Sequence, residues 1–238
     1  MLVLMIAWTG LMLACWLIGT AILHGLKGDC FERIGDRLII AAWLGVIILS
    51  VSLLAASLIV PLSPLVGAVV VITLAAIALS LQHTRAEIRT LLSVLSAKWL
   101  FGLITLEVIV AASASQKMTF FDTGLYHFQV IRWLSRFGAV PGLALIHNRF
   151  GFTSSWFALA APFNAGIFEA RTAALTSGFA FLLASLHCVI CLTRIWQDRG
   201  LFEDWFIVIF SFLCLPTISL YGMPISPSPD YLQSFLRG

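Results

Sequence analysis

The sequence predicts an all-α membrane protein, a polytopic bundle of about six transmembrane helices with an interfacial amphipathic helix. Composition is the first observation behind this prediction, since 61% of the 238 residues are hydrophobic, only 11% are charged, and the mean hydropathy is +1.03. Soluble domains average about 25% charged residues, so this chain cannot cover a globular surface with water-compatible side chains. The second observation is the repetition of long apolar runs separated by short polar segments.

Residues 1–115 are expected to form a four-span membrane region. The apolar runs in this region cover residues 1–24, 38–60, 65–81 and 99–115. The first run holds no Asp, Glu, Lys or Arg and no basic segment precedes it, which is typical of a transmembrane helix rather than a signal peptide. Residues 82–98 are expected to form a loop that is partly an amphipathic helix.

Residues 116–167 are expected to form a polar outer-face loop with an amphipathic helix. Apolar residues recur there at three-residue steps, at Leu125, Phe128, Ile131, Leu134 and Phe137. This spacing predicts a helix along the membrane surface, with Asp122 or Thr123 as its cap and Gly138 at its end. Residues 152–163 are apolar but too short to cross a bilayer, which favours a re-entrant or interfacial segment. Residues 168–238 are expected to supply two further spans and a short polar tail.

Loop charges predict the orientation of the chain. Residues 25–37 and 82–98 each include three basic residues, whereas the turn between the second and third spans has none. The positive-inside rule therefore places both basic loops in the cytoplasm. Counting spans then places the polar loop and the C-terminal tail on the outer face. The expected location is a plasma or bacterial inner membrane, crossed several times.

Several classes of function are excluded by composition and motifs. The net charge of +3 arises without a basic run of the kind that binds nucleic acid, so membrane lipids are the expected partners. The chain lacks the common nucleotide-binding, dinucleotide-binding and hydrolase motifs. Cys188 and Cys191 lie beside His187, but no second ligand pair accompanies them, which favours ordinary helix residues over a metal site. No motif names a cofactor.

Residues 120–152 form a polar island that concentrates ionisable side chains: Asp122, His127, Arg132, Arg136, His147 and Arg149. Membrane proteins place such groups mainly where recognition or chemistry occurs. Asp122 directly follows two phenylalanines at a membrane exit. Partial desolvation there makes a carboxylate a better base, so Asp122 is the catalytic candidate. The alternative interpretation is a helix cap.

The basic residues of the island suit phosphate. His127 and His147 are candidates for acid–base chemistry or phosphate binding, and otherwise are interfacial polar residues. Arg132 and Arg149 fit phosphate recognition, because a guanidinium binds phosphate through two parallel hydrogen bonds. Their alternative is contact with lipid headgroups. Arg149 is the more pointed candidate, since it lies between aromatic and glycine residues.

Two ionisable residues lie inside predicted spans, Glu107 and His187. An ionisable side chain is costly in the hydrocarbon region and by default marks a buried partner or a transport pathway. These residues support an alternative function as a transporter or proton-coupled permease. A non-catalytic membrane scaffold subunit is a third hypothesis.

Two sets of motifs in the polar island resemble known families. Phe120-Phe121-Asp122, followed by Tyr126-His127 and an amphipathic helix that ends at Gly138, resembles the first external loop of the glycosyltransferase-C superfamily. Members of that superfamily are polytopic enzymes that use polyprenyl-phosphate-linked sugars. Arg149-Phe150-Gly151-Phe152 and Ser228-Pro229-Asp230 are similar to segments of uncharacterised bacterial multi-pass membrane proteins.

This resemblance implies a role for each matched residue. Asp122 would be the base that takes the proton of the acceptor hydroxyl in an inverting transfer. Arg149 or Arg132 would hold the donor phosphate. Further candidates for substrate binding are Tyr126, His127, His147 and Asp230. Superfamily members commonly begin with one span before the acidic loop, whereas four predicted spans precede it here. Members are also usually much longer, so this chain is expected to be a truncated member.

Overall fold

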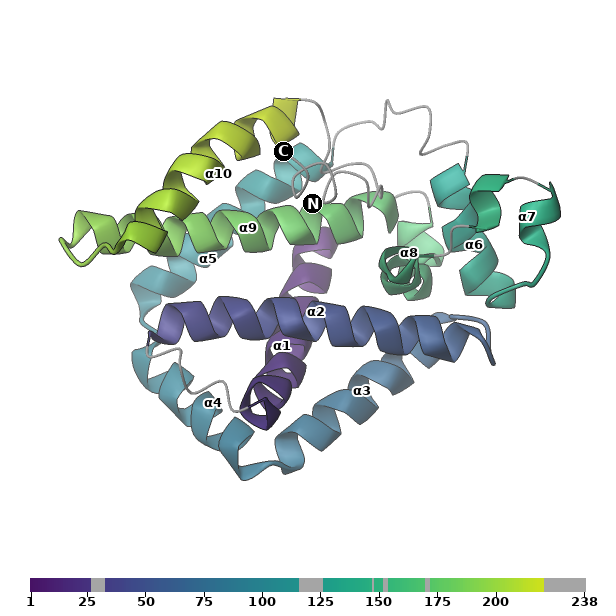
Figure 1. Ribbon diagram of the computed structural model, residues 1–238, viewed down its shortest axis with the longest axis horizontal. Coiled ribbons are helices and arrows are strands. Elements are labelled where there is room, and N and C mark those ends of the chain that lie inside the picture. Colours follow the sequence, from purple (N-terminus) through teal and green to yellow (C-terminus); the bar gives the residue numbers. More distant parts are fainter. Residues whose placement is uncertain (27–32, 116–125, 147, 152–153, 170–171, 221–238) are drawn as a thin grey trace.

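The computed structural model describes residues 1–26, 33–115, 126–146, 148–151, 154–169 and 172–220, and these residues form helices and their connections (Figure 1). The long helices are α1 (Leu2–Gly25), α2 (Ile34–Ser57), α3 (Pro64–Ser80), α4 (Gln82–Val94), α5 (Ala97–Ala114), α9 (Thr172–Trp196) and α10 (Phe202–Leu220). The shorter elements are α6 (Phe128–Phe137), α7 (Leu143–Ile146), η2 (Asn148–Gly151), α8 (Ser155–Ala160), η3 (Ala161–Phe163) and η4 (Gly166–Phe168).

Four helices in the described ranges are long and apolar enough to cross a membrane: α1, α2, α5 and residues 174–196 of α9. The pair α3 and α4 would add a fifth span if the two helices counted as one. The prediction of an all-α bundle with several helices of membrane-spanning length is therefore confirmed. The count of six spans stays a prediction.

The break between α3 and α4 is sharp, with the two helix axes bent by 91°. α3 is almost wholly apolar, whereas α4 carries Arg85 and Arg89 on its exposed surface. Each arginine costs about 2.5–3.5 kcal/mol at the centre of a membrane helix, so α4 is poorly suited to the hydrocarbon region. The expectation of an amphipathic helix within residues 82–98 is met by α4.

Serine caps define the starts of several helices. The Ser63 Oγ accepts a hydrogen bond from the Val66 backbone N–H at 3.3 Å, and Pro64 occupies the first position of α3. Ser96 and Ser154 cap α5 and α8 in the same way. These residues satisfy backbone donors that have no partner within the helix, which fixes where each helix begins.

Helices α1 and α2 cross where both carry small residues. A Cβ atom added at Gly19 would overlap the carbonyl oxygen of Ala41, and one added at Gly45 would overlap that of Cys15. The backbones therefore meet through reciprocal small residues spaced one turn apart. Such close approach is how apolar helices commonly associate in lipid, where burial from water supplies no attraction between them.

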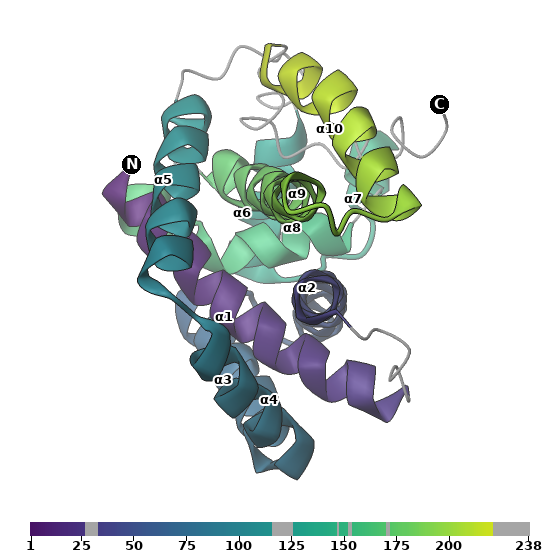
Figure 2. The same ribbon diagram turned by 90° about the vertical axis from the view of Figure 1, so that its left-hand side faces the viewer.

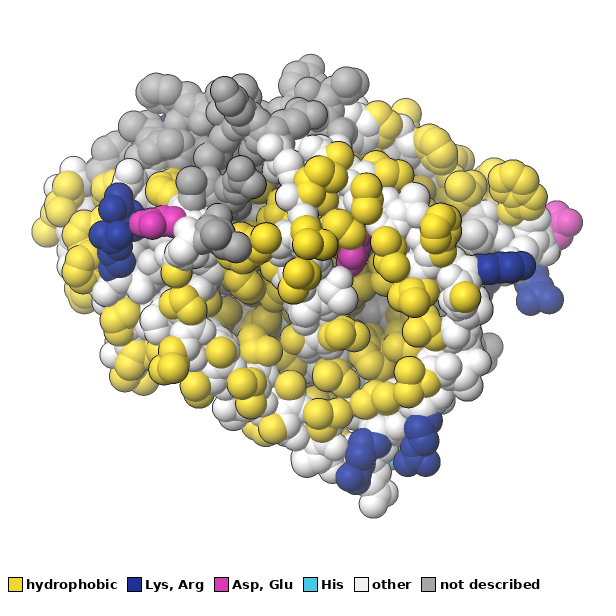
Figure 3. All heavy atoms as spheres, turned by 180° about the vertical axis from the view of Figure 1, so that it is seen from behind, with side chains coloured by type: hydrophobic (Ala, Val, Ile, Leu, Met, Phe, Trp, Pro, Cys, Tyr) yellow, Lys and Arg dark blue, Asp and Glu magenta, His cyan; other side chains and the backbone are white. Residues whose placement is uncertain are grey.

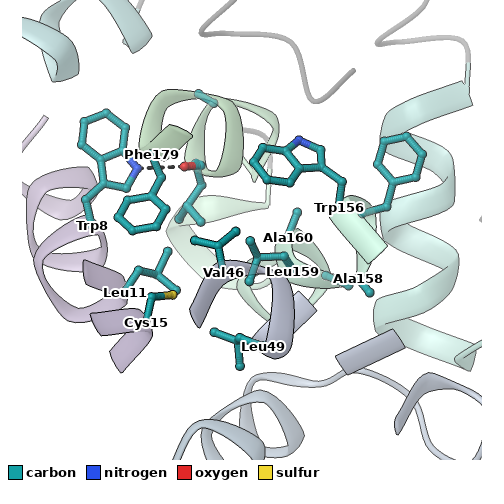
Figure 4. Packing of buried hydrophobic residues seen from close by; sticks show 14 of the residues in the cluster. Trp8, Leu11, Cys15, Val46, Leu49, Trp156, Ala158, Leu159, Ala160 and Phe179 are labelled. Atoms are coloured by element: carbon teal, nitrogen blue, oxygen red, sulfur yellow. Dashed lines mark hydrogen bonds between the residues drawn. The ribbon is translucent and has the colours of Figure 1, made fainter. Parts of the chain in front are cut away.

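The centre of the core is the short helix α8. Residues 156–160 are all buried, and α8 packs against α2, α9 and η3. Figure 4 shows Leu159 and Ala160 beside Val46 of α2. Helices from both halves of the chain cover the described side chains of residues 152–163, and the depth of this segment in the membrane stays a prediction.

A tryptophan joins the first helix to the ninth. The Trp8 Nε1–H donates a hydrogen bond of 2.8 Å to the Leu175 carbonyl oxygen, as Figure 4 shows. Gly178 leaves room for the indole ring, since an added Cβ there would lie 2.5 Å from it. The indole thus fills the α1–α9 contact and also satisfies its own polar atom.

Helices α2 and α9 have similar axial directions and lie close together, since both are seen end-on in Figure 2 and they are in contact. The start of α2 meets the end of α9, where Asp36 binds Arg194. At the other end of α2, the Ala139 N–H donates to the Ser57 carbonyl at 2.7 Å and the Leu62 N–H donates to the Leu134 carbonyl at 2.9 Å. One end of α2 therefore carries the ion pair between Asp36 and Arg194, and the other end is attached to helix α6.

Candidate functional site

The structure brings together three of the predicted site residues: Tyr126, His127 and Arg149. The guanidinium carbon of Arg149 lies 4.8 Å from the centroid of the Tyr126 ring. The rings of Tyr126 and His127 are in edge contact, with centroids 4.1 Å apart. We call these three residues the island cluster. Asp122, His147 and Asp230 lie outside the described residues.

His127 is the most enclosed member of the island cluster. Its side chain is 2% exposed, and its ring packs 5.3 Å from that of Phe157 in α8. The imidazole of His127 therefore packs against the core helix α8, while Arg149 is exposed and lies over the Tyr126 ring. A cation above an aromatic face gains about 0.5–1 kcal/mol at an exposed site, which restrains the guanidinium.

Backbone geometry places the cluster. His127 directly precedes α6, which begins at Phe128. Tyr126 and His127 already have helical backbone, so the first turn reaches back to the edge of the described residues, and the expected cap at Asp122 or Thr123 lies outside them. Arg149 lies in η2, which follows the turn at Gly142, where φ is +85° and a residue with a side chain would be strained. The chain thus returns from α6 through α7 to bring Arg149 over Tyr126.

Helix α6 shows the predicted amphipathic character. Ile131 and Leu134 are buried, whereas Arg132 and Arg136 are exposed. Arg136 forms an exposed ion pair with Glu169 at 3.3 Å, and such pairs contribute little to stability. Arg132 is placed on the open face of α6, away from the packed side, and its relation to the island cluster stays a prediction.

Glu107 lies elsewhere in the bundle. The Thr9 hydroxyl of α1 contacts both carboxylate oxygens of Glu107 in α5, at 3.2 and 3.3 Å. The Glu107 residue is only 4% exposed, as expected for an ionisable residue in an apolar helix. His187 lies in α9, two turns before Arg194, whose guanidinium binds Asp36 and Asp204. The structure therefore gives Glu107 a partner in α1 and places His187 in another helix.

Sequence reasoning missed a second polar group, which joins α2, α9 and α10. Asp204 binds Arg33 at 2.7 Å and Arg194 at 3.1 Å, and Arg194 also binds Asp36 at 2.6 Å. These four residues are the ionic cluster. Asp204 lies in the first turn of α10 and is 2% exposed. The signal in the sequence was a set of charged residues near several helix ends, which does not reveal the pairing.

Hydrogen bonding controls the ionisation of Asp204, which precedes the apolar stretch of α10. Burial opposes the charged form, but hydrogen bonds from the Leu201 backbone N–H and from two arginines outweigh it and lower the pKa of this carboxyl to about 2. Asp204 is therefore a structural anion at neutral pH rather than a proton donor.

The arrangement of the island cluster suits binding of an anion at an apolar boundary. Arg149 supplies charge, Tyr126 supplies a polar ring atom, and the neighbouring helix α7 exposes Leu145 and Ile146. Within the described ranges, no group of three or more His, Cys, Asp or Glu side chains could hold a metal ion. Arginine-based recognition of a phosphate on an apolar carrier is the chemistry that fits these residues.

A family model described as Domain of unknown function (DUF8201) matches residues 1–237. No match was found among the curated proteins or the solved structures. The matched range covers the positions of the island cluster, the ionic cluster and the α1–α2 crossing.

Proposed function

The chain belongs to the family described as Domain of unknown function (DUF8201), and we propose that it is a glycosyltransferase-like membrane protein that transfers a sugar from a polyprenyl-phosphate donor. The proposal includes six membrane crossings, with α10 as the last, and a place in the bacterial cell envelope. It also places the island cluster on the outer face, opposite the basic loops.

The observation that carries the proposal is Arg149 held over Tyr126 beside the buried His127. A polyprenyl phosphate presents a phosphate attached to a long apolar chain. The exposed guanidinium fits the phosphate, and the exposed Leu145 and Ile146 fit the apolar part. No nucleotide-sugar pool exists outside the cytoplasm, so a lipid-borne donor is the natural substrate for a site on that face.

In the proposed reaction, the carboxylate of Asp122 takes the proton of the acceptor hydroxyl. The acceptor oxygen then attacks the anomeric carbon of the sugar from the side opposite the phosphate. The bond between that carbon and the phosphate oxygen breaks, and the leaving phosphate keeps the electron pair. Arg149 stabilises the charge that develops on the phosphate, and the sugar configuration is inverted.

Transfer is tested with the protein reconstituted in vesicles that contain a polyprenyl-phosphate-linked radiolabelled sugar. Asp122→Asn is expected to lower the rate about 10²–10⁴-fold, because it removes a general base. Arg149→Gln is expected to raise KM for the donor and to weaken binding of farnesyl phosphate. Arg136→Gln is the matched control, since Arg136 is an exposed arginine paired with Glu169. Unchanged transfer in Asp122→Asn would contradict the proposal.

A second candidate, proton-coupled transport, is supported by the hydrogen bonds between Thr9 and the buried Glu107. In this alternative, Glu107 and His187 carry protons within the bundle. Proton-driven uptake into vesicles that is lost in Glu107→Gln and kept in Asp122→Asn would favour transport. The opposite pattern, with sugar transfer lost only in Asp122→Asn, would favour the transferase.

A further inference from the structure

Helix α4 has two distinct faces. Thr84 and Glu87 are buried against the bundle, whereas Arg85 and Arg89 are exposed and lie one helical turn apart. Residues four apart share one side of a helix, so the two guanidinium groups point to the same region of the surface. In Figure 3, basic side chains gather at the lower corner of the molecule, where Figure 1 places the junction of α3 and α4.

Two contacts hold the inner face of α4 in place. The Glu87 carboxylate binds the Arg37 guanidinium at 2.7 Å, and the rings of His83 and His24 stack with centroids 4.8 Å apart. These contacts join α4 to the start of α2 and the end of α1. The exposed arginines therefore lie on a helix that is held in a fixed position. This helix packs near the start of α2, which is also the end of α2 that carries the ionic cluster.

The exposed surface of α4 is apolar as well as basic. Leu92 is 65% exposed and Val94 is 47% exposed. Directly after α4, Leu95 is 47% exposed, and Trp99 in the first turn of α5 is 40% exposed. A helix with basic and apolar exposed residues, set sharply across an apolar helix, is typical of a segment in the headgroup region of a membrane. Tryptophan is enriched at that same depth.

We propose that α4 is a membrane-surface helix and that Arg85 and Arg89 bind the phosphate headgroups of anionic lipids in the leaflet facing the basic loops. Guanidinium groups bind phosphate oxygens, while Leu92 and Leu95 enter the boundary of the acyl chains. This site is separate from the island cluster, which lies at the other end of α2. It therefore does not depend on the proposed sugar transfer.

Lipid is favoured over a protein partner by the mixture of side chains. An acidic peptide would leave the neighbouring Leu92 and Val94 exposed, whereas an anionic lipid satisfies the arginines and the apolar side chains together. The loops expected to face the cytoplasm are basic as well, so the same leaflet already attracts anionic lipid.

The test is a titration of the full chain in detergent with phosphatidylglycerol and with phosphatidylcholine, with bound lipid counted by native mass spectrometry. The Arg85→Gln/Arg89→Gln variant is expected to raise the apparent Kd for phosphatidylglycerol about 30-fold, equal to about 1 kcal/mol for each basic residue at an anionic surface. Binding of phosphatidylcholine is expected to stay unchanged. The selective binding should weaken as salt increases.

Two further variants separate charge and position. Arg85→Lys/Arg89→Lys keeps both charges and is expected to retain most of the preference for phosphatidylglycerol. Arg136→Gln removes an exposed arginine at the other end of the molecule and is expected to leave the preference intact. The proposal is overturned if the glutamine double variant keeps its preference for phosphatidylglycerol, or if Arg136→Gln loses as much of it. Binding of an acidic peptide in place of phosphatidylglycerol would also overturn it.

Discussion

Replacing Gly45 with alanine tests the close crossing of α1 and α2. The added Cβ would lie 2.6 Å from the Cα atom of Cys15, whereas carbon atoms in ordinary contact are about 3.5–4.0 Å apart. The carbonyl oxygen of Cys15 would lie closer still, so the backbones of α1 and α2 must separate by more than about 1 Å to admit one methyl group. Neighbouring buried residues, among them Leu11, Val46 and Leu49, move apart with them.

The expected cost follows from this displacement. A gap of about 0.5–1 Å removes a quarter to a half of each dispersion contact across it, and overpacking a dense core costs about 1–3 kcal/mol. Alanine is also favoured over glycine within a helix by about 1 kcal/mol. The free energy of unfolding of Gly45→Ala should therefore lie about 2 kcal/mol below that of a glycine-to-alanine variant in open space.

Two other helical glycines supply matched controls. Gly10 in α1 and Gly102 in α5 are helical, and an added Cβ at either would meet no atom within 4 Å. Titration with SDS in mixed micelles, followed by tryptophan fluorescence, measures the free energy of unfolding. Gly45→Ala is expected to unfold at a lower SDS fraction than wild type, and Gly10→Ala and Gly102→Ala at the same or a higher one. Equal midpoints for all three variants would refute the reasoning.

Two further predictions concern polar contacts. Trp8→Phe removes the hydrogen bond to the Leu175 carbonyl and leaves a small cavity, so it is expected to cost about 1–3 kcal/mol in the same SDS titration. The Asp204 carboxyl has a pKa of about 2 in the folded protein, against an ordinary value of 3.8. It therefore binds its proton more weakly in the folded state, and its charged form stabilises the fold at pH values above 3.8. Acidification from about pH 4 to about pH 2 should therefore remove about 2 kcal/mol of stability, and Asp204→Asn should lack this part of the pH dependence of thermal unfolding. An Asp204→Asn variant with the same pH dependence as wild type would contradict the role assigned to the ionic cluster.

The positions of the long helices could be predicted because apolar runs and breaks are local properties of the sequence. The run 65–81 corresponds to α3 within one residue at each end, since Pro64 and a serine cap fix its start. The start of α2 was predicted four residues too late, because Asp36 looked like part of a charged loop. In the structure its charge is bound by Arg194, which allows the helix to begin at Ile34.

Long-range contacts could not be predicted from spacing. The ion pair between Arg33 and Asp204 joins residues 171 positions apart, and no local pattern relates them. The buried position of α8 was missed because six residues are too few to show whether they face lipid or protein. Within the island, residue types pointed to His127 and Arg149, and the family resemblance pointed to Tyr126, whereas their contacts depend on the return of the chain through α7.

The attachment of α6 to the turn after α2 uses main-chain atoms, through the bonds from Ala139 to Ser57 and from Leu62 to Leu134. Gly138 is required there, since its φ is +74° and an added Cβ would lie 2.5 Å from the Ser57 oxygen. Main-chain bonds do not depend on which side chains α6 carries. Substitutions on its open face can therefore accumulate over evolution and alter what the helix meets, while the helix itself stays in the same place beside the core.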